Sequence, residues 1–97
     1  MIDGTTTITT PGTAQQVVTT NKPCKRVWVQ AHISNGDLTN GGGVVVGVST
    51  VVAALSGRRG IALNAGEGEW FHVTNANQLY FDAIDATAKV HWIVEEF

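Results

Sequence analysis

The sequence predicts a small all-β protein, an antiparallel β-sandwich of jelly-roll type with about seven or eight strands. Three observations predict it: β-branched residues are abundant, turn residues recur about every eight to twelve positions, and 14% of the residues are charged against 43% hydrophobic. β-branched side chains favour extended backbone. The 97 residues leave room for a single domain.

Residues 1–13 are predicted to form an extended N-terminal arm, and residues 14–97 a single sandwich domain. The first thirteen residues are rich in Thr, carry few apolar side chains and end after Pro11-Gly12. Such a segment buries too little surface to order itself in isolation. We expect it to add to a sheet edge or to dock on a neighbouring molecule, with a frayed terminus as the alternative. The docking candidates are Thr5, Thr6, Thr7, Ile8, Thr9 and Thr10.

The strands after the arm can be placed by alternation and by turn residues. In 25–33, Val27, Val29 and Ala31 alternate with polar or aromatic neighbours, as in a strand with one buried face. The other expected strands are 14–20, 44–46, 61–63, 69–74, 78–83 and 89–95. Residues 34–43 are predicted to form a Gly/Asn-rich loop. The apolar run 51–55 fits either a strand or a short helical turn.

The sequence contains no grouping of residues typical of catalysis, so we expect neither enzyme activity nor a cofactor. A general acid needs an apolar pocket that raises its pKa, and neither pair of carboxylates has such flanks: Glu67 and Glu69, Asp82 and Asp85. The histidines lack the close spacing of metal ligands and are better interpreted as surface residues. They are His32, His72 and His91.

The lone cysteine, the net charge and the hydropathy restrict compartment and partners. Cys24 excludes an internal disulfide, fits packing beneath a sheet and predicts synthesis in a reducing cytosol. A formal net charge of −2 argues against nucleic acid, because phosphates are bound mainly by Lys and Arg. We expect no membrane partner, because no apolar run approaches the ~18 residues of a membrane span. The first residues also lack the pattern of a signal peptide.

Aromatic side chains provide the candidate interface. Trp28 and Tyr80 alternate outward on their strands, and Trp70 has polar neighbours of the same parity, whereas Trp92 shares the parity of a core position. Outward aromatics are enriched at protein interfaces, so Trp28 and Tyr80 are the predicted oligomer contacts. Sugar stacking on these rings and burial under a loop are the alternatives.

The basic pair Arg58-Arg59 lies in a Gly-flanked turn. We expect it to contact an acidic partner surface, with a solvated turn that discourages edge pairing as the alternative.

The order of motifs resembles that of small virion structural proteins of tailed bacteriophages. The shared pattern is carried by 23–31 (PCKRVWVQA), 45–49 (VVGVS), 60–67 (GIALNAGE), 71–75 (FHVTN), 79–83 (LYFDA) and 90–93 (VHWI). The resemblance implies a capsid cement (decoration) protein, a homotrimer on the outer surface of the head. It would stabilise contacts between major capsid protein subunits. Within that interpretation, we expect the basic pair Arg58 and Arg59 to make the shell contact. A phage tail, fibre or baseplate module and a carbohydrate-binding module are the alternatives.

Overall fold

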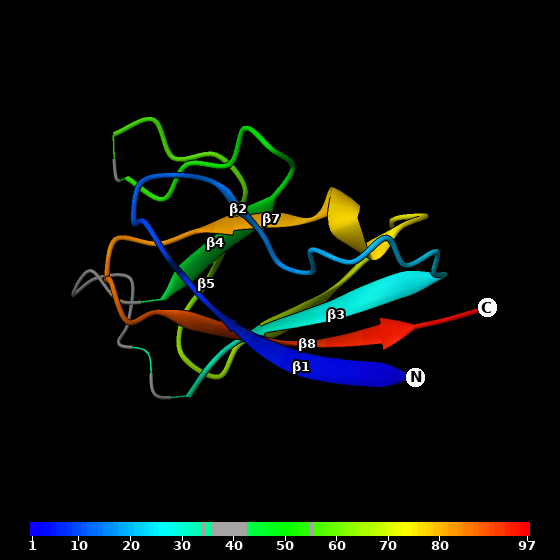
Figure 1. Ribbon diagram of the computed structural model, residues 1–97. Helices are drawn as coiled ribbons and strands as arrows, with labels where there is room; N and C mark the ends of the chain where they lie inside the picture. The colour runs from blue at the N-terminus through cyan, green and yellow to red at the C-terminus, as the bar shows by residue number, and fades with distance from the viewer. Residues whose placement is uncertain (34, 36–42, 55) are drawn as a thin grey trace.

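The computed structural model describes residues 1–33, 35, 43–54 and 56–97. Within these ranges the chain forms two four-stranded antiparallel sheets, which confirms the predicted β-sandwich. Sheet A has the strand order β1-β8-β3-β6, and sheet B has the order β2-β7-β4-β5 (Figure 1). The strands are β1 (Ile2–Thr7), β2 (Gln15–Gln16), β3 (Arg26–Ala31), β4 (Val44–Gly47), β5 (Ile61–Leu63), β6 (Gly68–Phe71), β7 (Tyr80–Asp82) and β8 (Lys89–Glu95). A single 3₁₀ turn, η2 (Ala76–Gln78), precedes β7 in the described part of the chain.

The pairings follow one long antiparallel ribbon wound into two layers. β4 pairs with β5, β3 with β6, β2 with β7 and β1 with β8. These four pairs alternate between sheet B and sheet A, and the pairs β3–β8 and β4–β7 complete the sheets. The first and last strands therefore lie side by side, and both termini emerge at the same end of the molecule (Figure 1).

The core lies between the sheets and is built mainly from alternate valines. On β3 the buried residues alternate with half-buried ones, as the sequence predicts. Val27, Val29, Val90 and Val94 of sheet A are fully buried against residues of sheet B that include Phe81. Each such side chain stabilises the fold by roughly 1.5–3 kcal/mol through its removal from water. Cys24 is buried in the same core, and burial raises the pKa of its thiol.

The prediction of a separate extended N-terminal arm is wrong, whereas the expected addition to a sheet edge is observed: residues 2–7 form β1 at the edge of sheet A. The threonines pair along the whole strand with β8, from Ile2 opposite Val94 to Thr7 opposite Lys89. Ile8 is 3% exposed and belongs to the core. Thr6 Oγ1 donates to the Val17 carbonyl at 2.7 Å and accepts from Trp92 Nε1 at 3.0 Å. The segment is ordered by its own sandwich because its alternate residues meet β8 and the core.

A second, smaller core covers the outer face of sheet B. Val45 and Tyr80 point away from the main core and pack with Val51, Ala53 and Ala14. The segment 51–54 is neither a regular strand nor a helix, although Val52 and Arg59 form an isolated antiparallel bridge. Leu55 and most of the predicted loop 34–43 lie outside the described residues. Where the chain is described, no helix has the length and apolarity needed to cross a bilayer.

Candidate functional site

The outer face of sheet A carries a row of side chains that crosses all four strands. In register, Trp28 of β3 lies between Trp70 of β6 and Ile93 of β8, and Ile93 lies opposite Asp3 of β1. The rings and Ile93 are half-buried, although they face away from the core. We call the group Arg26, Trp28, Trp70, Ile93 and Glu95 the aromatic face. The register places these side chains together on the outer face of sheet A.

The two tryptophans hold each other at a fixed angle. The ring centroids of Trp28 and Trp70 are 5.5 Å apart with the planes at 63°, an edge-to-face contact. The Arg26 guanidinium carbon lies 3.9 Å from the Trp70 centroid, a cation–π contact. Trp28 lies over Gly68, where an added Cβ would come within 2.3 Å of the ring. Glycine at 68 thus leaves room for the indole, which occupies the space that a side chain would fill.

The aromatic face includes an ion pair. Arg26 donates from Nε to the Glu95 carboxylate on the neighbouring strand, where the two residues are in register. The hydrogen bond from Arg26 is the main reason that the pKa of Glu95 lies below its ordinary value. The guanidinium is therefore held by a carboxylate on one side and an indole ring on the other.

Tyr80 and Trp28, the two predicted interface aromatics, lie on different sheets. Tyr80 belongs to β7 of sheet B and packs in the second core, under the segment that follows β4. Trp70, which the sequence placed outward, is the residue that joins Trp28. Trp92 packs against the main core from the sheet A side, as predicted.

The basic pair is divided between two roles. Arg58 directs both Nε and Nη2 at the Ala53 carbonyl, at 3.0 and 2.7 Å, and so ties the turn to the second core. Arg59 pairs through its backbone with Val52, and its side chain is exposed. Of the two, Arg59 presents the freer charge to a partner.

Asp82 and Asp85, two of the carboxylates considered as general acids, accept hydrogen bonds that do not suit that role. Asp82 is 1% exposed and accepts hydrogen bonds from Gly12 N and Ala53 N, both at 2.9 Å. It joins the segment before β2 to the segment after β4. Asp85 is exposed, and hydrogen bonds from Thr87 lower its pKa, the direction opposite to that of a general acid at neutral pH.

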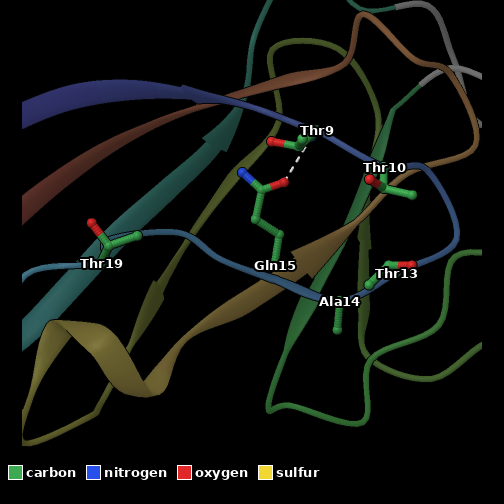
Figure 2. Close-up of a pocket in the computed structure, with 6 residues that line it drawn as sticks. All are labelled: Thr9, Thr10, Thr13, Ala14, Gln15 and Thr19. Carbon is green, nitrogen blue, oxygen red and sulfur yellow. Dashed lines mark hydrogen bonds between the residues drawn. The ribbon is translucent and has the colours of Figure 1, made fainter.

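The threonine segment borders a shallow hollow of about 360 Å³ (Figure 2). Thr9 and Thr10 line it from the end of the β1 segment, and Gln15 faces them from β2. Gln15 bonds Thr9 N through Oε1 at 2.7 Å and the Thr7 carbonyl through Nε2 at 3.0 Å. The remaining lining residues are Thr13, Ala14 and Thr19. Thr5 lies outside the hollow, with Oγ1 3.4 Å from His91 Nδ1.

The histidines do not converge in the part of the chain that the structure describes, where no group of three His, Cys, Asp or Glu is placed to hold a metal. His91 Nε2 lies 3.7 Å from the Asp3 carboxylate on the outer face of sheet A. His72 is exposed just after β6.

The contributors that sequence reasoning missed include Gly68, Ile93 and Gln15. Ile93 has the same parity as His91, and this parity places both side chains outward. Gly68 lies next to an expected strand, where a glycine indicates that another group approaches the backbone closely. For Gln15 the sequence contains no such indication, because its partners belong to a segment predicted to be an arm.

Comparisons of the chain with protein-family models, with curated proteins and with solved structures found no match. The functional conclusion therefore rests on the geometry above and on the motif pattern of the sequence.

Proposed function

We propose that this chain is a structural protein of a tailed-phage virion, a capsid cement protein that binds the outer surface of the head. In this proposal it stabilises contacts between major capsid protein subunits and acts as a homotrimer, without catalysis. The observation that carries the proposal is the aromatic face, a rigid outward surface of two tryptophans and an isoleucine on a sandwich. Such surfaces favour protein partners, because Trp and Arg dominate interface energies.

The strand order supports this proposal. We infer that the ribbon with orders β1-β8-β3-β6 and β2-β7-β4-β5 is a jelly roll, an architecture used in viral capsid and lectin domains. Many small contacts repeated by symmetry give avidity that a single small face lacks. A tail, fibre or baseplate role would use the same surface.

Sugar binding has less support from the geometry. A stacking platform needs ring faces that are open and aligned with the sugar. Here the indole planes stand at 63°, Arg26 covers one face of Trp70, and Tyr80 lies on the other sheet. The aromatics therefore do not form one coplanar strip.

The test is the mass of the purified protein by light scattering, followed by binding to phage heads stripped of their cement protein. A mass of three times 10.3 kDa and saturable binding to heads are expected. Trp28→Ser should weaken both, whereas Val48→Ser, which changes a 65% exposed valine outside this face, should weaken neither. A monomer at high concentration that also fails to bind heads would contradict the proposal. Oligosaccharide binding by calorimetry, lost in Trp28→Ser, would favour the sugar-binding alternative.

A further inference from the structure

The edges of the two sheets differ in how well they are protected. Natural sheets protect their edges with short strands, charges, prolines or bulges. Among the described strands, β2, β5 and β6 are edges of two, three and four residues. β1 is an edge of six residues, Ile2-Asp3-Gly4-Thr5-Thr6-Thr7, with one charge and no lysine or proline. β1 is therefore the edge best suited to pair with another strand.

The hydrogen-bond phase shows which groups of β1 face outward. Ile8 N donates to the Ala88 carbonyl at 2.9 Å, so residues 8 and 88 continue the β1–β8 register as a hydrogen-bonded pair. Hydrogen bonding alternates along an antiparallel strand. Even-numbered residues of β1 therefore bond to β8, and the backbone groups of Asp3, Thr5 and Thr7 point away from the sheet.

Gln15 confirms this phase and marks where the free edge ends. Its side-chain amide bonds the Thr7 carbonyl and Thr9 N, as a neighbouring strand would. The outward groups of Asp3 and Thr5 and the Thr7 N–H have no such partner among the described residues. The open stretch runs from residue 3 to residue 7.

We propose that β1 pairs antiparallel with β1 of a second copy of this chain, about a two-fold axis at Thr5. Thr5 then lies opposite Thr5 of the partner subunit, and Asp3 lies opposite Thr7 of the partner subunit. Each of these is a hydrogen-bonded pair. The Thr7 carbonyl accepts from Gln15 with one lone pair and from Asp3 N of the partner subunit with the other. Side chains that face outward meet side chains that face outward. The two copies of sheet A become one continuous eight-stranded sheet.

Two features select this register from its neighbours. A shift of one pair toward the N-terminus makes the two Asp3 carboxylates diagonal neighbours. A further shift puts them directly opposite each other, where like charges destabilise the strand pair. A shift toward the C-terminus needs Thr9 N, whose single hydrogen already bonds to Gln15, whereas the Thr7 carbonyl can accept a second hydrogen bond. The register centred on Thr5 satisfies the open groups and keeps the charges apart.

The contact is isologous, because it uses the same patch on both copies. It lies at the β1 edge of sheet A and therefore leaves the aromatic face free. It does not rest on the proposed function. If the chain forms trimers on a shell, two-fold contacts of this kind would join neighbouring trimers.

Engineered cysteines test the register. Cα atoms of a hydrogen-bonded antiparallel pair are about 5.5 Å apart, within the range of a disulfide. Thr5→Cys should therefore form a disulfide dimer on mild oxidation. Thr7→Cys is the matched control: its two copies lie four residues apart along the strand, about 13 Å, too far to bridge. Cys24 is 1% exposed and does not compete. Absence of the Thr5→Cys dimer, or equal cross-linking at both positions, would overturn the proposal.

A charge variant tests the same contact without cross-linking. Thr5→Lys places two ammonium groups opposite each other and should weaken two-fold association at least tenfold by analytical ultracentrifugation. Thr20→Lys adds the same charge at an exposed position outside β1 and should leave association unchanged. Circular dichroism checks that both variants fold. Equal association of the two folded variants would refute the pairing. Cross-linking without head binding would refute the cement role alone, and head binding without cross-linking would refute the pairing alone.

Discussion

Single residues in this protein often connect segments that are far apart in sequence. Asp82 is the clearest case, because its carboxylate accepts from the backbone at residues 12 and 53. A carboxylate with two backbone donors is a charge-assisted latch. Its removal leaves the buried Ala53 N–H without this acceptor, whereas Gly12 N also donates to the Ala83 carbonyl at 3.2 Å.

Asp82→Ala should lower the free energy of unfolding by about 2–4 kcal/mol, because both latch bonds are lost in a buried site. Asp82→Asn keeps one acceptor oxygen and should lose less. Urea denaturation followed by circular dichroism measures both. Asp85→Ala, at an exposed position, is the control and should cost less than either. Equal stability of Asp82→Ala and the wild type would show that the latch contributes nothing.

The burial of Asp82 illustrates the limit of sequence reasoning at the residue scale. Alternation along 78–83 correctly places Phe81 inward and Tyr80 and Asp82 outward from the sandwich. Alternation assigns a face, but it does not reveal that other segments cover that face. It also does not say to which sheet a strand belongs, so it predicts one interface from Trp28 and Tyr80, which lie on different sheets.

At the scale of elements, the alternating strands were predictable and β1 was not. The strand 89–95 was predicted with the same bounds as β8, because Val90, Trp92 and Val94 share one parity. In β1 the alternation is carried by threonines and a glycine, which sequence patterns do not separate from a solvated arm. Its partner is the last strand, so no local pattern indicates the pairing.

Ile8→Ala distinguishes an edge strand anchored in the core from a loose arm. The side chain is 3% exposed, so its truncation should cost about 2–4 kcal/mol of stability. Ile33→Ala removes the same atoms from a residue that is 77% exposed and should change stability by less than about 0.5 kcal/mol. Thermal unfolding of the two variants gives the comparison. Equal, small effects would mean that the segment is not anchored.

The Arg26–Glu95 pair predicts a pH dependence for the contact between β3 and β8. The folded pKa of Glu95 lies below its ordinary value of 4.5, mainly because of the hydrogen bond from Arg26. The stabilisation is therefore present above pH 4.5 and is lost as pH falls through the folded pKa. The stability difference between the wild type and Glu95→Gln should be largest near neutrality and shrink in acid. Glu69→Gln, an exposed position, should show no such trend. A difference that grew on acidification would contradict this assignment.

At the scale of the whole molecule, the winding of the ribbon affects the folding rate, because its outer strand pairs join residues that are far apart in sequence. The pair β1–β8 joins residue 2 to residue 94, and β2–β7 joins residue 15 to residue 81. These closures cost chain entropy before their contacts form.

Refolding should therefore be slow for a chain of this size, in the range of about milliseconds to seconds. Stopped-flow dilution from urea, followed by far-ultraviolet circular dichroism, measures the rate. A complete refolding phase within tens of microseconds, the timescale of a hairpin, would contradict the expectation.

The division of the aromatic residues between the sheets makes the protein its own optical reporter. The three tryptophans, Trp28, Trp70 and Trp92, belong to β3, β6 and β8 of sheet A, and Tyr80, the single tyrosine, belongs to β7 of sheet B. Indole emission therefore monitors one layer of the sandwich, whereas far-ultraviolet circular dichroism monitors the strands of both layers. If sheet A loses its structure before sheet B, or after it, the two signals will change at different denaturant concentrations without any added label.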